Sequence, residues 1–180
     1  MARVLVPLAD GFEEVEAITI IDILRRGDIE VCVASLGTLD VKGAHAITVR
    51  ADVLFDDRGD EPFEMIVLPG GYGGTMALAN DHRVQGLLKA MDDQGLWIGA
   101  ICAAPIALDK AGVLKEGFTC YPSCEEAIDT IGYDPTRQVM LTQNILTSRG
   151  PATAFSFALE IIRLLQGASK ADDVASQILY

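Results

Sequence analysis

The chain has 180 residues, of which 50% are hydrophobic, and its 26 acidic and 14 basic residues give a formal net charge of -12. A chain of this length is most simply one domain over residues 1–180, large enough to bury roughly two thirds of its unfolded surface. The negative charge disfavours nucleic acid and anionic membrane surfaces as partners. The early Asp10 argues against a signal peptide and no apolar run is long enough to cross a membrane, so we expect a cytoplasmic protein.

Apolar runs and helical patterns alternate along the chain. The predicted strands cover residues 4–8, 29–36, 65–68, 97–101, 118–121, 139–142 and 145–147. The predicted helices cover residues 13–26, 80–94, 103–111, 124–131, 155–165 and 169–178, and a weak alternation at 41–54 suggests a short hairpin or edge excursion. This order predicts a doubly wound α/β fold with a mainly parallel sheet and helices on both faces.

Three of these strands end in residues suited to chemistry. Leu8 precedes a glutamate-rich turn, Leu68 precedes Pro69-Gly70-Gly71, and Ile101 precedes Cys102. In doubly wound sheets, ligands bind at the carboxyl ends of the strands. We therefore expect a carboxylate, a glycine turn and a thiol to converge at one edge of the sheet.

Cys102 is predicted to lie in a sharp turn between a buried strand and a helix, which is the geometry of a nucleophile elbow. At a helix N-terminus the macrodipole would stabilise its thiolate and lower its pKa. The alternative is that Cys102 is a small buried hydrophobe, the interpretation we favour for Cys32 in the middle of an apolar strand. The position of Cys102 favours a functional role.

The remaining cysteines give no sign of a metal centre. In a reducing compartment all four cysteines are expected to be free thiols. The pattern Cys120-x-x-x-Cys124 lacks the two-residue spacing and the nearby histidines of a zinc site. We expect neither a metal nor a cofactor.

The first predicted helix carries Glu13, Glu14 and Glu16 in its first turn, where carboxylates also interact favourably with the helix dipole. At 100° per residue, Glu13 and Glu16 fall inside the apolar stripe of this helix and Glu14 falls outside it. Two carboxyl groups are thus predicted to point inward. A buried carboxyl has a raised pKa and can stay protonated, so it could donate a hydrogen bond to a thiolate.

Gly70 and Gly71 are either a tight turn or part of an oxyanion hole, in which their exposed N–H groups and that of Ala103 would face a substrate oxygen. A cysteine–histidine pair needs a histidine, and the chain has only His45 and His82. His82 follows Asn80-Asp81 at a predicted helix start and is expected to face solvent. His45 lies in a loop of uncertain position.

Four motifs occur in order along nearly the whole chain. They are Asp10-Gly11-Phe12-Glu13-Glu14-Val15-Glu16, Val67-Leu68-Pro69-Gly70-Gly71, Ala100-Ile101-Cys102-Ala103-Ala104-Pro105, and Leu146-Thr147-Ser148-Arg149-Gly150-Pro151 running into Phe155. With these motifs the chain resembles the ThiJ/PfpI superfamily, in the branch of the Parkinsonism-associated deglycase and its bacterial relatives. The resemblance implies a flavodoxin-like homodimer in which Cys102 is the oxidisable nucleophile and Glu16 its protonated hydrogen-bond partner. It also implies a pocket lined by Glu13, Gly70, Gly71 and Ala103.

Two positions depart from the pattern of that branch. Where well-studied members carry a histidine before a proline near the cysteine, this chain has Tyr121-Pro122. We expect Tyr121 to bind substrate or donate a proton in its place. Where some relatives carry an arginine that reaches the neighbouring subunit's pocket, this chain has His45. The intracellular peptidases of the superfamily place a histidine after the nucleophile, so Ala103 argues against peptidase activity.

The resemblance implies two functions. The first is an enzyme that converts methylglyoxal to lactate without glutathione, or that repairs glycated proteins, through Cys102 and Glu16. The second is a redox sensor or redox-regulated chaperone in which Cys102 is oxidised to a sulfinate without fast catalysis. An inert cysteine on the same fold is the third possibility, because a fold alone does not establish a function.

Overall fold

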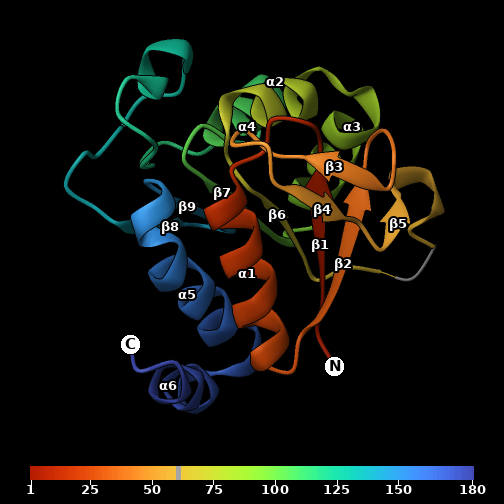
Figure 1. Ribbon diagram of the computed structural model, residues 1–180. Coiled ribbons are helices and arrows are strands. Elements are labelled where there is room, and N and C mark those ends of the chain that lie inside the picture. The colour runs from red at the N-terminus through yellow and green to blue at the C-terminus, as the bar shows by residue number, and fades with distance from the viewer. Residues whose placement is uncertain (60–61) are drawn as a thin grey trace.

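The computed structural model describes residues 1–59 and 62–180, and its centre is a seven-stranded sheet (Figure 1). The strand order is β5-β2-β1-β6-β7-β9-β8. All neighbouring strands are parallel except β8 and β9, which form an antiparallel hairpin at one edge. The strands are β1 (Arg3–Leu8), β2 (Glu30–Ser35), β5 (Val53–Leu54), β6 (Met65–Leu68), β7 (Trp97–Ile101), β8 (Val139–Thr142) and β9 (Ile145–Ser148). The predicted doubly wound, mainly parallel sheet is confirmed.

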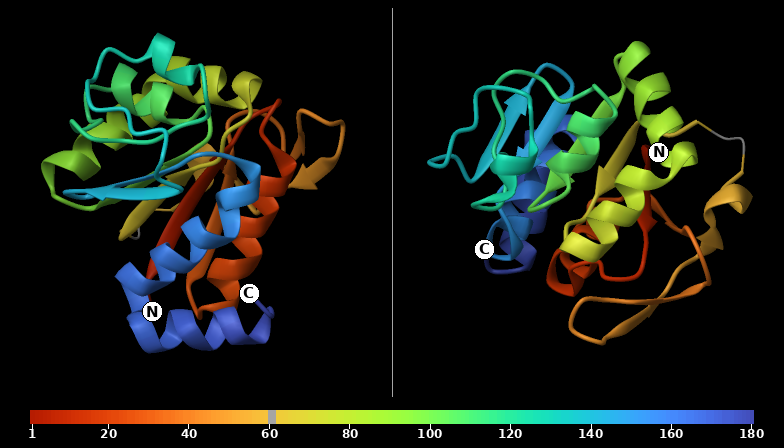
Figure 2. Two further views of the ribbon diagram at one scale, coloured as in Figure 1. Left: turned by 90° about the vertical axis from the view of Figure 1, so that its left-hand side faces the viewer. Right: turned by 90° about the horizontal axis from the view of Figure 1, so that it is seen from above.

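Helices cover both faces of the sheet (Figures 1 and 2). They are α1 (Glu14–Arg26), α2 (Tyr72–Asn80), α3 (His82–Asp93), α4 (Pro105–Lys110), α5 (Ala154–Gln166) and α6 (Ala168–Gln177). Successive strand residues point to opposite faces, so Val4 and Val6 pack with α1 and α5 while Leu5 packs with α3 and α4. Within the residues described, no helix has both the length and the apolarity needed to span a bilayer.

A separate two-stranded sheet folds over the start of α1. It consists of β3 (Asp40–Lys42) and β4 (Thr48–Arg50), which pair antiparallel and confirm the hairpin predicted within residues 41–54. The Gly11 amide donates to the Lys42 carbonyl at 2.8 Å, and the Ala44 amide donates to the Phe12 carbonyl at 2.8 Å. These bonds hold the hairpin against the β1–α1 turn.

The helix predicted at 80–94 is α3, which begins at His82 because the Asp81 side chain accepts hydrogen bonds from the Arg83 and Val84 amides and caps it. A further helix, α2, precedes it and was not predicted, because Gly73 and Gly74 are typical of a loop. A Cβ at Gly74 would lie 2.9 Å from the Phe12 backbone, so these glycines let α2 pack against the β1–α1 turn.

The prediction was wrong in the segment between α4 and β8. Residues 118–121 form no strand, only an isolated bridge between Phe118 and Tyr133, and residues 124–131 contain only a 3₁₀ turn at Cys124–Ala127. The backbone here is bonded to other parts of the chain, since the Thr119 amide donates to the Thr147 side chain. In Figure 2 this segment extends away from the sheet as a long loop.

The other helices and the last hairpin agree closely with prediction. The turn between β8 and β9 has Gln143 at φ +55°, as a tight hairpin requires. Helices α5 and α6 lie where they were predicted. The helix predicted at 103–111 is shorter and begins at Pro105.

Candidate cysteine site at the carboxyl end of the sheet

Cys102 lies in the sharp turn that was predicted between β7 and α4. Its backbone has φ +64°, an uncommon and strained conformation for a residue other than glycine. The Cys102 amide donates to the Ser148 carbonyl at 2.9 Å, which ties the turn to the end of the neighbouring strand β9. The thiol is thereby held above the sheet edge in a partly buried position.

Glu16, in the first turn of α1, reaches the same point. Its side chain is fully buried, and Oε2 accepts a hydrogen bond from the Gly70 amide at 2.8 Å. The carboxyl also interacts with the Cys102 thiol. The other oxygen, Oε1, has no hydrogen bond of ordinary geometry to any described residue.

Gly70 provides the space in which this contact forms. A Cβ on Gly70 would lie 2.5 Å from the Cys102 Cβ and 2.6 Å from Glu16 Oε2. Neither separation is possible for real atoms, so the thiol and the carboxyl can meet only above a residue without a side chain.

The environment of Glu16 favours its protonated form. Burial raises the pKa of the carboxyl to about 7, although the hydrogen bond from Gly70 and the contact with Cys102 act in the opposite direction. The nearby Glu13 carboxylate raises the pKa further. A substantial fraction of Glu16 therefore carries a proton at neutral pH, as the inward-pointing position in the sequence predicted.

The predicted lowering of the Cys102 pKa is wrong for this conformation. Burial raises the pKa of the thiol, and negative charge on Glu16 raises it further. The Gly71 and Ala103 amides lower it, but their effect is smaller. Helix α4 has only six residues and begins three positions after the cysteine, so its dipole does little for the sulfur.

The Gly71 and Ala103 amides nevertheless interact with the Cys102 sulfur. The Gly70 amide, which was predicted as an oxyanion donor with them, donates to Glu16 instead. Gly71 has φ +83°, and a Cβ there would lie 2.4 Å from the Gly11 carbonyl oxygen. Only glycine fits this position. The structure thus gathers Cys102, Glu16, Gly70, Gly71 and Ala103 in one place.

Glu14 was predicted to lie outside the buried stripe, and this prediction is wrong. Its side chain is buried under the β3–β4 hairpin, where Oε1 accepts the His45 and Ile47 amides and Oε2 lies 2.9 Å from His45 Nδ1. Desolvation raises the pKa of this carboxyl, but the hydrogen bonds outweigh it and the net pKa is lowered. The periodicity of one helix could not reveal a covering hairpin.

Glu13 lies beside this pair, with Oε1 3.7 Å from His45 Nδ1 and most of its side chain buried. Glu13, Glu14 and His45 also form a group whose ligand atoms lie within 4.8 Å of one another, so in size they could hold a metal ion. The Glu14 oxygens are already occupied by hydrogen bonds, which explains the cluster as an ion pair. His82 is exposed, as expected.

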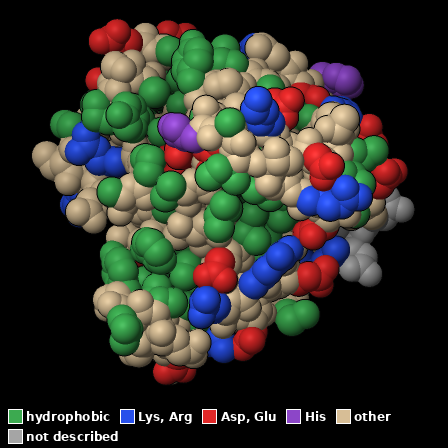
Figure 3. All heavy atoms as spheres, in the orientation of Figure 1, with side chains coloured by type: hydrophobic (Ala, Val, Ile, Leu, Met, Phe, Trp, Pro, Cys, Tyr) green, Lys and Arg blue, Asp and Glu red, His purple; other side chains and the backbone are tan. Residues whose placement is uncertain are grey.

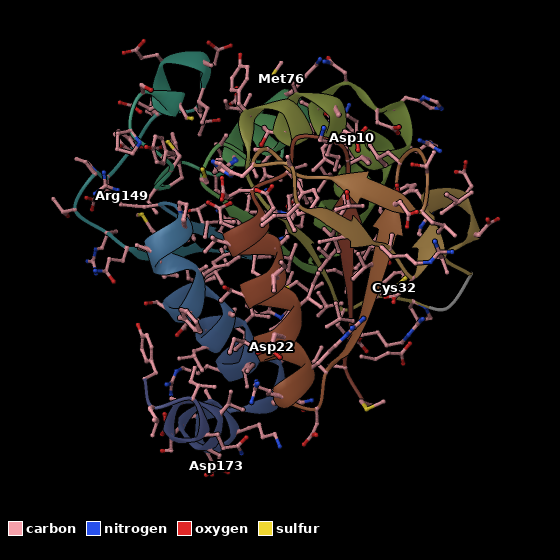
Figure 4. The ribbon with its side chains drawn as sticks, viewed as in Figure 1. Asp10, Asp22, Cys32, Met76, Arg149 and Asp173 are labelled. Carbon is pink, nitrogen blue, oxygen red and sulfur yellow. The ribbon has the colours of Figure 1, made fainter. Side chains whose placement is uncertain are left out.

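Tyr121 adjoins the cysteine through its backbone. Its amide donates to the Cys102 carbonyl at 2.9 Å, and its half-exposed ring lies over Gly150, where a Cβ would come within 3.1 Å of it. The ring lines a cavity of about 270 Å³ together with Arg149 and Pro151. Sequence analysis assigned no role to Ser148 and Arg149, although both lie in the fourth motif and the Ser148 carbonyl anchors the Cys102 turn. Figure 4 shows Arg149 where the long loop meets the start of α5.

Comparison with known proteins agrees with this geometry. The sequence profile of the DJ-1/PfpI family matches residues 2–164. The chain is 36% identical over 174 residues to the glutathione-independent glyoxalase DJR-1.2 of Caenorhabditis elegans, covering 96% of this chain and 92% of that protein. It is 38% identical over 172 residues to protein DJ-1 homolog B of Arabidopsis thaliana, covering 93% of this chain but only 39% of that longer protein. The crystal structure of Drosophila melanogaster DJ-1beta superposes with a TM-score of 0.95 at 38% identity, covering 99% of this chain and 97% of that one.

Proposed function

This chain belongs to the DJ-1/PfpI family, and on that premise we propose that it is a cysteine-dependent stress enzyme acting on methylglyoxal-type dicarbonyls or their protein adducts. The observation that carries the proposal is the meeting of the Cys102 thiol with the Glu16 carboxyl above Gly70. This arrangement supplies a nucleophile and a proton carrier in one partly buried site.

The residues divide the reaction between them. The Cys102 sulfur adds to the aldehyde carbon of methylglyoxal while its proton passes to the Glu16 carboxylate. The Gly71 and Ala103 amides hold the oxygen that becomes negative. Glu16 returns the thiol proton to this oxygen, which gives a hemithioacetal. The Glu16 carboxylate then moves a proton from the aldehyde-derived carbon to the neighbouring carbon, and water cleaves the resulting thioester to release lactate and the Cys102 thiol. A carboxyl with a pKa near neutral is suited to these transfers.

A chiral lactate assay with purified protein and methylglyoxal tests this proposal. We expect Cys102→Ser to abolish turnover and Glu16→Gln to lower it by about 10²-fold or more, the contribution typical of an acid–base group. Cys32→Ser is the matched control, because Cys32 lies on β2 well away from the site (Figure 4). Turnover that survives in Cys102→Ser would overturn the proposal.

A redox sensor is the second candidate, and two observations favour it. Tyr121 stands where catalytically active relatives are expected to carry a histidine. Glu16 Oε1 is buried without a partner among the described residues, so a protonated Glu16 could donate to an oxygen added to the sulfur. Peroxide treatment should then add two oxygens to the tryptic peptide of residues 90–110, which contains Cys102, before any other cysteine peptide changes. Equal oxidation of all four cysteines would contradict the sensor.

We further propose that the protein is a cytoplasmic homodimer that pairs through the outer face of α1 and the hairpin. Val15, Ile18 and Ile47 are 53%, 46% and 52% exposed there, and Figure 3 shows hydrophobic side chains gathered over this face. A second copy would cover them and would bring His45 near the partner's site. Light scattering on Ile18→Glu should show monomers where the parent chain shows dimers, and a monomeric parent would contradict the pairing.

A further inference from the structure

Two further cysteines flank Tyr121 on the loop between α4 and β8. Cys120 is fully buried and Cys124 is partly buried, and both side chains pack into the hydrophobic cluster that contains Phe118. The function proposed above uses neither thiol. They are four residues apart, and Tyr121, which directly follows Cys120, is the residue bonded to the Cys102 backbone.

The loop bends back so that the two cysteines lie close together. The Cys124 amide donates to the Tyr121 carbonyl at 3.0 Å, which closes a turn that begins one residue after Cys120. Such a turn keeps the Cα atoms of its ends within about 7 Å of each other. The Cys120 sulfur accepts a hydrogen bond from the Glu125 amide. This sulfur therefore lies beside the residue that directly follows Cys124. The ends of this turn are Tyr121 and Cys124, and Cys120 is the residue directly before it. Closure to a disulfide requires the Cα atoms of the two cysteines to come within about 4.4–6.8 Å of each other.

The polar atoms around the two cysteines are incompletely paired. Glu125 Oε2 and Arg149 Nε are both buried and lack hydrogen-bond partners among the described residues. No described residue has a hydrogen bond to the Cys124 thiol that turning this side chain would break. The Cys124 side chain can therefore turn without losing a hydrogen bond to its sulfur.

We propose that Cys120 and Cys124 are a reversible dithiol that closes into a disulfide around Tyr121 when it meets a low-molecular-weight disulfide of the glutathione type. The more accessible Cys124 sulfur attacks the glutathione disulfide, whose S–S bond breaks as the mixed disulfide forms and the first glutathione leaves with the Cys124 proton. The Cys120 sulfur then attacks Cys124 and expels the second glutathione, which takes the Cys120 proton. The two protein thiols are oxidised by two electrons, and glutathione disulfide is reduced to two thiols.

This couple is separate from the chemistry of Cys102 and does not depend on the proposed function. It does adjoin the same site, because the Tyr121 amide inside the ring donates to the Cys102 carbonyl. Burial raises the pKa of Cys120 to about 12 and also raises that of Cys124. Thiolate is the attacking species, so closure is slow at neutral pH and accelerates as the pH rises.

Tryptic digestion separates the relevant thiols, which makes the test direct. Residues 116–137 form one peptide that holds Cys120 and Cys124 and no other cysteine, whereas Cys32 lies in 27–42 and Cys102 in 90–110. The full-length Cys102→Ser protein is incubated in glutathione buffers of increasing oxidised fraction, alkylated under denaturing conditions, digested and weighed. We expect peptide 116–137 to lose both alkyl groups and to be two hydrogen atoms lighter than its dithiol form, and dithiothreitol to reverse the change.

Cys124→Ser should abolish the closed peptide and leave Cys120 alkylated, and its circular dichroism shows whether the chain still folds. Cys32→Ser is the matched control and should close like the parent chain. Double alkylation of peptide 116–137 at every buffer composition would overturn the proposal. A stable glutathione adduct on Cys124 as the end product would overturn it too, because Cys120 would then have failed to resolve the mixed disulfide.

Discussion

The Gly70 amide donates a 2.8 Å hydrogen bond to Glu16 Oε2 across 54 residues of sequence. The bond joins the turn after β6 to the first turn of α1, and it fixes the carboxyl by one oxygen only. The second oxygen is buried and has no hydrogen-bond partner among the described residues. One glycine thus serves twice, as the donor that orients the carboxyl and as the gap through which the carboxyl and the thiol meet.

Gly70→Ala should disrupt the site more than its size suggests. The added methyl would lie 2.5 Å from the Cys102 Cβ and 2.6 Å from Glu16 Oε2, so the thiol and the carboxyl must separate. We expect a loss of about 1–3 kcal/mol in the free energy of unfolding, measured by urea titration, because overpacking at rigid contacts costs this much. Methylglyoxal turnover should fall with it.

Gly86→Ala is the matched control for this substitution. Gly86 lies within α3, and a Cβ there would meet nothing within 4 Å. Alanine is the better helix former, so the free energy of unfolding of this variant should rise by about 0.5–1 kcal/mol. Its activity should equal that of the parent chain. A Gly70→Ala protein as stable and active as the parent would show that the contact at Gly70 is not what holds the site together.

The pH dependence of the free energy of unfolding should reveal the raised pKa of the buried Glu16 carboxyl. The pKa of Glu16 is about 7 in the folded chain against 4.5 for the ordinary group, so the folded state binds more protons between these values. The stabilisation is fully present below pH 4.5 and is lost as the pH rises towards 7. The loss amounts to about 3 kcal/mol at 1.36 kcal/mol per pKa unit, as an order of magnitude.

Glu16→Gln isolates this contribution because the amide oxygen can still accept the Gly70 N–H but does not titrate. Urea titrations at several pH values should show that, between pH 4.5 and 7, the free energy of unfolding of the variant rises relative to that of the parent chain. Glu126→Gln changes an exposed carboxyl and should retain the slope of the parent. Parallel curves for Glu16→Gln and the parent would mean that Glu16 is ionised in the folded protein throughout this range.

The sequence predicts which segments form the site, because each of these segments follows the end of a predicted strand. The strands ending at Leu8, Leu68 and Ile101 are short apolar runs, and parallel packing brings their carboxyl ends together whatever the rest of the chain does. Glu16 is predicted to point inward from the helical period alone. These are local patterns that tertiary contacts reinforce.

The failures occur where a remote segment decides the outcome. Glu14 is buried by a hairpin some thirty residues further along the chain, and the raised pKa of Cys102 comes from burial that no local pattern reveals. The loop after α4 contains residues with strand and helix propensity, but its amides are bonded to Thr147 and Cys102 instead. Propensity is overridden when backbone groups find distant partners.

His45 should titrate above its ordinary range because it is hydrogen-bonded to Glu14. The hydrogen bond to Glu14 and the charges of Glu13 and Glu14 raise the pKa of His45 above 6.5. The stabilisation of the hairpin is therefore fully present below pH 6.5 and is lost as the pH rises through the folded pKa. An NMR titration of the imidazole should show the raised midpoint, and hydrogen exchange of the His45 and Ile47 amides should speed up above it.

Glu14→Gln should return the His45 midpoint towards 6.5 and expose the same amides to faster exchange at every pH. Glu160→Gln, on α5 and remote from the hairpin, should leave both readouts as they are in the parent. A midpoint that does not move in Glu14→Gln would assign the shift to Glu13 alone.

Tyr121→His should raise turnover with methylglyoxal if the missing imidazole limits this chain. The residue at this position is held beside the nucleophile by the bond from its own amide to the Cys102 carbonyl, which any side chain at 121 keeps. A histidine there adds a group that exchanges protons near neutral pH, and acid–base groups contribute about 10²–10⁴-fold when well placed. We expect kcat/KM to rise at least about tenfold, less than the full contribution because the neighbouring side chains do not orient the new imidazole. Tyr121→Phe keeps the ring and removes the hydroxyl, so equal activity of the Phe variant and the parent would show that the phenol takes no part in proton transfer. A Tyr121→His protein no faster than the parent would instead place the limit at the burial of Cys102 and favour the sensor over the enzyme.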